Sequence, residues 1–121
     1  RESNMSTEGT LLNTDYTVGG GEVTVADITV TAKSTLDLYF NAANMLSGDV
    51  INIRILVPST LADTPTAAVN EEFQFTDVEN DPMIRSFPNV LEPGQHYQLM
   101  FEQTAGTARD FNWRVADVPI N

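Results

Sequence analysis

The sequence predicts an all-β protein, a single-domain antiparallel β-sandwich of about seven to eight short strands. Short runs of β-branched and aromatic residues alternate with polar residues at period two, as expected of strands that bury one face. Turn signals separate these runs at intervals of roughly 8–12 residues, and no long window carries the helical period. The length of 121 residues fits one domain. The pattern is compatible with an immunoglobulin-like or a jelly-roll-like sandwich, and both stay open.

The chain begins with a polar stretch. We expect residues 1–9 to form a flexible arm in front of a sandwich domain over residues 10–121. Met5 is either a natural initiator behind four vector residues or an internal residue of a processed product, and the sequence leaves both open. The apolar pair Leu11 and Leu12 opens the first ordered segment.

The first half of the domain has three predicted strands. The opening segment ends at three consecutive glycines, which mark a turn because ordering them costs much backbone entropy. The apolar parity of the next strand flips between Val25 and Ile28, which predicts a bulge or a crossing between sheets. Pro58 ends the clearest strand, which has four β-branched residues on one face. In order, the opening segment and the strands cover residues 11–18, 22–32, 36–40 and 51–57, with the only candidate helical turn at 42–46.

The second half has shorter strands and longer connections. Small and polar residues predict a surface loop, and Pro88 and Pro93 predict an irregular segment. Alternation of aromatic and polar residues predicts two late strands. In order, we expect a loop at 59–70, a short strand at Phe73 and Phe75, an acidic turn at 77–82, an irregular segment at 83–94, a strand at 97–101, a turn at 103–110 and a strand at 111–115.

The net charge excludes two classes of partner. Acidic residues number 17 against six basic ones, and the formal charge is −11. Phosphate binding needs clustered Lys and Arg, and this chain has Lys33 as its only lysine. We therefore expect binding neither to nucleic acid nor to anionic membrane surfaces.

The composition also argues against catalysis. The chain has no cysteine, which excludes disulfides, thiol catalysis and Cys-based zinc sites. His96 is the only imidazole, and we interpret it as an exposed edge residue rather than as the base of a triad. Close carboxylate pairs arise by chance among so many acids, so we expect neither a catalytic site nor a cofactor.

One acidic turn carries ligands that suit calcium. Asp77, Glu79, Asn80 and Asp81 supply hard oxygen atoms within five residues. The run lacks the spacing and the central glycine of an EF-hand loop. We favour a solvated acidic turn and keep a calcium site as the alternative.

Aromatic residues offer a possible platform for stacking a sugar. Tyr97, Phe101, Phe111 and Trp113 alternate with polar residues in the two late strands, so we expect them to face the core. Tyr39 has the opposite parity to its apolar neighbours and is the better candidate for an exposed aromatic side chain.

The C-terminal hairpin carries a family resemblance. Residues 101–115, FEQTAGTARDFNWRV, resemble a pattern in small virion-associated proteins of tailed bacteriophages. In that pattern a strand ends in Gln-Thr-Ala-Gly-Thr, turns through an Arg and an aromatic residue, and returns through a Trp. The LDL run at 36–38 and the Gly-Asp turn and strand at 46–55 are similar to the same proteins. The match covers about residues 35–116, with variable loops between 58 and 88.

The resemblance implies a structural β-sandwich that decorates or cements a phage capsid. The expected partners are the major capsid protein and copies of this chain, as a trimer or dimer. An acidic surface suits the outside of a virion better than its DNA-facing lining. The hairpin tip leaves polar groups for a partner, and the apolar start of the domain adds area as an arm. The candidate interface residues are Leu11, Leu12, Gln103, Thr104, Gly106 and Thr107.

Two other functions remain as alternatives. The first is a receptor- or glycan-binding module of a tail fibre or baseplate, with Tyr39 or Trp113 stacking on a sugar. The second is an extracellular adhesion domain stabilised by calcium, which predicts a melting temperature that rises with the metal.

Overall fold

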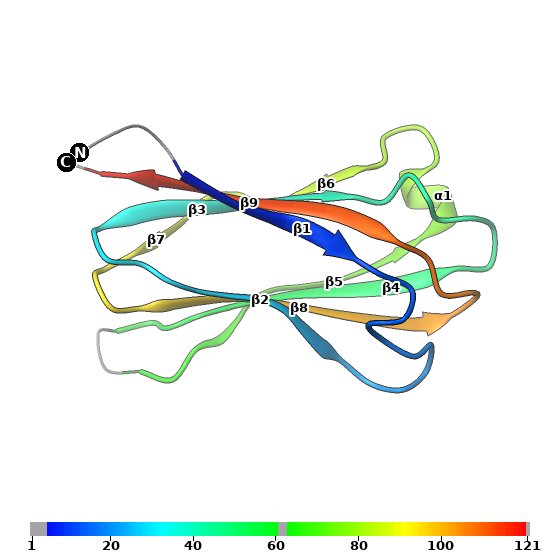
Figure 1. Cartoon of the computed structure of the whole chain (residues 1–121), viewed down its shortest axis with the longest axis horizontal. Helices are drawn as coiled ribbons and strands as arrows, with labels where there is room; N and C mark the ends of the chain where they lie inside the picture. The colour runs from blue at the N-terminus through cyan, green and yellow to red at the C-terminus, as the bar shows by residue number, and fades with distance from the viewer. Residues whose placement is uncertain (1–4, 61–62, 121) are drawn as a thin grey trace.

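Two antiparallel sheets pack face to face in the computed structural model, which describes residues 5–60 and 63–120 (Figure 1). No helix in these ranges is long and apolar enough to cross a membrane. In chain order the elements are β1 (Met5–Leu11), β2 (Val23–Thr29), β3 (Ser34–Asn41), β4 (Val50–Val57), β5 (Thr66–Gln74), α1 (Phe75–Val78), β6 (Met83–Arg85), β7 (Asn89–Leu91), β8 (His96–Ala105) and β9 (Phe111–Pro119).

The strand order identifies the sandwich as a jelly roll. Sheet A has the order β1-β9-β3-β6, and sheet B has the order β2-β8-β4-β5. The short strands β6 and β7 pair with opposite ends of β3, so they act as two halves of one interrupted strand. Counted in this way, eight strands form two four-stranded sheets with the strand orders of a jelly roll. The predicted all-β sandwich is confirmed.

The core lies between the sheets and is rich in phenylalanine. Buried and part-exposed residues alternate along β3, β4 and β8, as expected of strands with one inward face. Phe40, Phe101 and Phe111 come from three strands, and their ring centroids lie 5.3–5.7 Å apart. Tyr97 is also fully buried, as predicted, whereas Trp113 is only half-buried.

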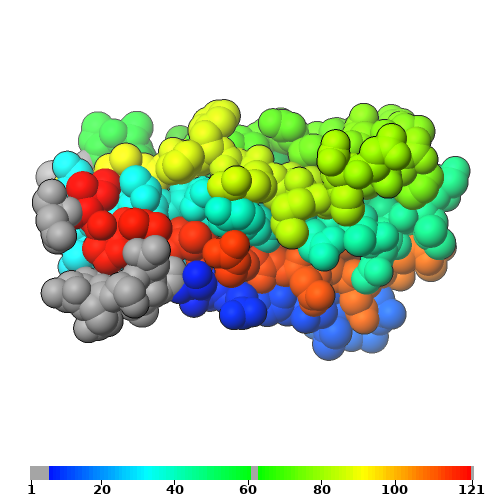
Figure 2. Space-filling view, turned by 90° about the horizontal axis from the view of Figure 1, so that it is seen from above, coloured from blue at the N-terminus to red at the C-terminus, as the bar shows by residue number. Residues whose placement is uncertain are grey.

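Three connections meet at one end of the sandwich, on the right of Figure 1. They are the β1–β2 loop (12–22), the β3–β4 loop (42–49) and the β8–β9 loop (106–110). We call this end the loop end. The outer face of sheet A is a separate surface, on which β1, β9, β3 and β6 lie side by side (Figure 2).

The predicted flexible arm is wrong for residues 5–9. They form most of β1, which pairs with β9 along its whole length, from Met5↔Asp117 to Leu11↔Phe111. An edge strand can be polar, so the sequence carried no alternation to reveal it. A Cβ atom added at Gly9 would lie 3.2 Å from the Trp113 ring, and the glycine therefore lets the indole pack against β1. The first four residues of the expected arm lie outside the described residues.

Other differences concern edge strands and turns. Thr66 begins β5 inside the predicted loop 59–70, and β6 and β7 lie in the segment 83–94 that was expected to be irregular. Most residues of β5 are exposed because it forms the edge of sheet B. Phe75 begins α1 instead of ending a strand, and residues 42–46 form turns rather than helix.

Candidate functional site

A buried carboxylate ties two loops together at the loop end. Asp49 is 1% exposed and accepts hydrogen bonds from the backbone N–H groups of Leu46 (2.9 Å) and Thr107 (3.0 Å). Arg109 Nε donates at 2.9 Å to Oδ2, the oxygen that also accepts the Leu46 N–H. Burial alone would raise the pKa of the Asp49 carboxyl, but the hydrogen bonds from Arg109 and the two backbone groups outweigh it, and the pKa lies below its ordinary value.

A second buried group attaches the β1–β2 loop to the same structure. The Tyr16 hydroxyl accepts the Arg109 N–H at 2.7 Å and donates to Gln103 Oε1 at 2.7 Å. The Gln103 amide nitrogen then donates to the carbonyl oxygens of Ala105 (3.0 Å) and Thr107 (2.8 Å). These bonds satisfy the buried amide and fix the three loops relative to one another.

Gly106 is required by this packing. Its φ of +94° lies in the region that L side chains rarely adopt. An added Cβ would also approach the Asp49 Cα to 2.7 Å, which is a collision with backbone. This glycine lies in the turn predicted at 103–110, which the structure places between the end of β8 at Ala105 and the start of β9 at Phe111. The sequence showed Asp49 only as part of a turn, because nothing in the pattern marked its carboxylate as buried.

The structure corrects part of the predicted interface. Leu11 is 5% exposed and Gln103 is fully buried, so neither side chain is available to a partner. Gln103 and Thr104 also belong to β8 rather than to the turn. Leu12, Thr104 and Thr107 are exposed, and hydrogen bonds join their two loops, including Asn13 N–H to Asp110 Oδ1 at 2.7 Å. These exposed residues, with Gly106, therefore lie at one end of the molecule.

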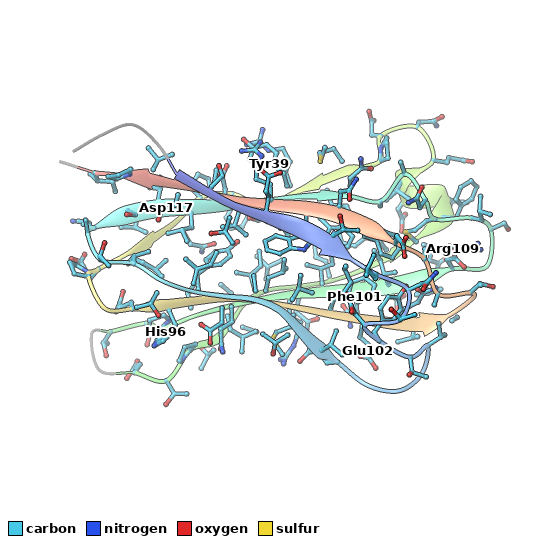
Figure 3. The ribbon with its side chains drawn as sticks, viewed as in Figure 1. Tyr39, His96, Phe101, Glu102, Arg109 and Asp117 are labelled. Carbon is cyan, nitrogen blue, oxygen red and sulfur yellow. The ribbon has the colours of Figure 1, made fainter. Side chains whose placement is uncertain are left out.

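The two aromatic residues considered for glycan binding lie in different places. Tyr39 is half-buried on the outer face of sheet A, where the guanidinium carbons of Arg85 and Arg114 lie 4.2 and 3.9 Å from its ring centroid (Figure 3). Trp113 lines a cleft of about 320 Å³ between the edge strands β1 and β2, together with Gly9 and other residues.

The acidic turn and the histidine do not form reactive clusters. Within residues 5–60 and 63–120, no three His, Asp or Glu side chains come together to hold a metal ion. Asp77, one of the calcium candidates, accepts the Gln74 N–H at 2.8 Å at the start of α1. His96 is exposed, and Thr29 and Asp27 both contact its Nδ1, at 3.0 and 3.1 Å. Both contacts fall on the same ring nitrogen, and no hydrogen bond joins Nε2 to another of the described residues.

Comparison with known proteins gave one structural likeness. No protein-family model matches the chain, and no curated protein matches it. A chain in a solved structure of infectious bursal disease virus, Gt strain, is similar to it with a TM-score of 0.40 and 13% sequence identity. The match covers 98% of this chain and 31% of the viral chain, so this chain spans about a third of that length.

Proposed function

We propose that this chain is a structural virion protein that binds the outer surface of a tailed-phage head and stabilises it without catalysis. Its partners are the major capsid protein and further copies of this chain, arranged as a trimer or dimer. A decoration protein gains occupancy from many copies and many weak contacts, so it needs a rigid binding surface rather than a reactive site.

The observation that carries this proposal is the rigidity of the loop end. The Asp49 and Tyr16 hydrogen bonds hold three loops in one conformation, so little entropy is lost when they bind. Leu12 and Leu46 project from two of these loops and are 45% and 54% exposed. Apolar side chains on a fixed polar surface are the usual centre of a protein interface.

The charge of the chain agrees with an outward position. A protein of net charge −11 repels DNA, other particles and anionic cell surfaces. The same charge opposes close packing of its own copies at low salt, so binding to the shell is expected to strengthen as salt screens the repulsion.

The experiment is to add the purified protein to undecorated tailed-phage capsids and to measure co-sedimentation and the temperature of shell rupture. Burial of one half-exposed leucine is worth about 1.5 kcal/mol, so Leu12→Ser and Leu46→Ser are each expected to weaken binding by about tenfold. Val90→Ser is the control, because Val90 is 57% exposed but lies on β7, outside the loop end. Absence of binding at micromolar protein would refute the proposal.

A glycan-binding module of a tail fibre or baseplate is the second candidate function. The Trp113 cleft favours it, because an aromatic side chain next to polar groups suits a sugar, whereas the faces of the Tyr39 ring are covered by Arg85 and Arg114. Trp113 is the only tryptophan, so its fluorescence reports on that cleft alone. Fluorescence that stays unchanged across a panel of sugars would count against the cleft.

A further inference from the structure

The outer face of sheet A carries an ordered block of side chains. The register places Tyr39 beside Arg114 and Asn41 beside Asn112 on the neighbouring strands β3 and β9. The same two rows continue to Arg85 and Met83 on β6 and to Glu8 and Thr10 on β1. Six of these residues line a shallow depression of about 200 Å³: Glu8, Tyr39, Asn41, Met83, Asn112 and Arg114. The depression lies on rigid strands rather than on loops.

Apart from the Glu8 carboxylate, which is an acceptor, the polar groups of this depression are mainly donors. Asn112 Oδ1 accepts the Thr10 hydroxyl at 2.8 Å, and Asn41 Oδ1 accepts the Ala43 N–H at 2.9 Å. Both amide oxygens are therefore engaged, and both NH₂ groups have no acceptor among the described residues. The Arg114 guanidinium adds further N–H groups, also without an acceptor in the described part of the chain. A surface that offers N–H donors beside a cation selects an anion.

Arg114 differs from the other described Lys and Arg residues in its lack of an ion pair. Of the five basic residues described, Lys33, Arg54, Arg85 and Arg109 each form an ion pair with a carboxylate. Arg114 forms none within the described ranges and stacks at 3.9 Å on the Tyr39 ring. Stacking fixes the plane of the guanidinium and leaves its edge open for a two-pronged contact with a carboxylate.

The neighbouring charges limit the anion to one negative charge. Arg85 is already balanced by Asp37, whose carboxylate lies 3.1 Å from Arg85 Nη2. Glu8 is the cross-strand neighbour of Arg114 on β1 and lines the same depression, where its carboxylate repels a second negative charge. A single guanidinium that forms no ion pair within the described ranges, next to the Glu8 carboxylate, therefore matches a carboxylate better than a phosphate dianion.

The apolar surface beside the donors indicates the rest of the ligand. Met83 is 50% exposed and supplies this apolar surface, whereas the two arginines cover the faces of the part-buried Tyr39 ring. A volume of about 200 Å³ holds one sugar ring, whose C–H faces pack on such surfaces and whose hydroxyls suit the amide groups. We propose that the Arg114, Asn41 and Asn112 depression binds the carboxylate of an acidic sugar, such as a uronate unit of a glycan. This proposal does not rest on attachment to a capsid.

The test is an NMR titration of the ¹⁵N-labelled protein, read at the side-chain NH₂ signals of Asn41 and Asn112. Sodium glucuronate is compared with glucose, acetate, inorganic phosphate and a glutamate-rich peptide at about 0.15 M salt, where the Debye length is about 8 Å. We expect glucuronate to shift both NH₂ signals with a Kd of a few millimolar. Acetate, glucose, phosphate and the peptide are each expected to bind at least tenfold more weakly.

Two charge-matched variants make the assignment specific. Arg114→Gln is expected to raise the Kd for glucuronate at least tenfold. Arg54→Gln removes the ion pair between Arg54 on sheet B and Glu22 in the β1–β2 loop, and is expected to leave this Kd unchanged. The backbone spectrum of each variant shows that it is folded. The proposal is overturned if glucuronate causes no shift at ten times the expected Kd, if Arg114→Gln binds it equally well, or if any comparison ligand binds as tightly.

Discussion

Removal of the Asp49 carboxylate is the sharpest test of how the loop end is held together. Asp49→Ala leaves the N–H groups of Leu46 and Thr107 without their acceptor, at about 1 kcal/mol each. It also removes the charged hydrogen bond from Arg109, worth about 1.5 kcal/mol because that side chain is partly exposed. The expected loss is about 3.5 kcal/mol of unfolding free energy, or about 14 °C in melting temperature for a domain of this size.

The assay is urea unfolding followed by the fluorescence of Trp113, with Asp27→Ala as the control. Asp27 also has a side-chain partner, but its contact with the His96 ring is half-exposed, so its loss is expected to cost less than about 0.5 kcal/mol. The folded-state pKa of Asp49 is lowered, so its contribution is present above about pH 4 and is lost as the pH falls through that pKa. Asp49→Ala is therefore expected to flatten the acid limb of the stability curve. A loss below 1 kcal/mol, or one equal to the control, would refute the reasoning.

Three further predictions concern the same fold. Burial raises the pKa of Tyr97 to about 12, so stability is expected to fall by about 2 kcal/mol between pH 10 and pH 12. Tyr97→Phe is expected to remove that fall in urea titrations across this range. Gly106→Ala is expected to lower the free energy of unfolding by at least 2 kcal/mol in the same assay. Because the added methyl group disturbs Asp49, the double variant with Asp49→Ala is expected to lose less than the sum of the two single losses. Additive losses would contradict the contact between these two residues. Phe101→Ala is expected to cost about 3–5 kcal/mol by calorimetry, because the ring is fully buried between two other phenylalanines; a loss under 1 kcal/mol would be inconsistent with this core.

The central strands could be predicted from the sequence because one face of each strand is buried and the other is partly exposed. In β4, Ile51, Ile53 and Ile55 are buried while the intervening residues are part-exposed, so burial and alternation coincide. The predicted parity change between Val25 and Ile28 corresponds to a register shift between Thr24 and Ala26 in β2. A bulge next to the predicted position explains why both halves of that strand can face the core.

Edge strands could not be predicted because pairing, rather than burial, holds them. All of β1 from Ser6 to Thr10 is exposed, and its stability comes from hydrogen bonds to β9. Phe87 lies between the short strands β6 and β7 and is 71% exposed although it is apolar. Hydrophobicity and burial therefore do not coincide in this segment. The amino-acid composition of a segment does not show which neighbouring strand it will pair with.

The candidate sites show the same limit. The sequence indicated Gln103 and Thr107 as interface residues at the hairpin. It did not show that the Gln103 amide forms hydrogen bonds with the Tyr16 hydroxyl and with backbone carbonyls. The pairing of Asn41 with Asn112 depends on the register of strands that are 70 residues apart in the chain. Tyr39 was identified correctly as an outward-facing residue because strand parity alone decides that property.

The central claim is that the loop end attaches the protein to a viral shell. The most direct measurement is the number of copies that co-sediment with undecorated tailed-phage capsids, for the natural chain and for the Leu12→Ser, Leu46→Ser and Val90→Ser variants. We predict hundreds of copies per shell for the natural chain and for Val90→Ser, and about tenfold weaker binding for each loop-end variant. No binding, or equal binding by all variants, would contradict the claim.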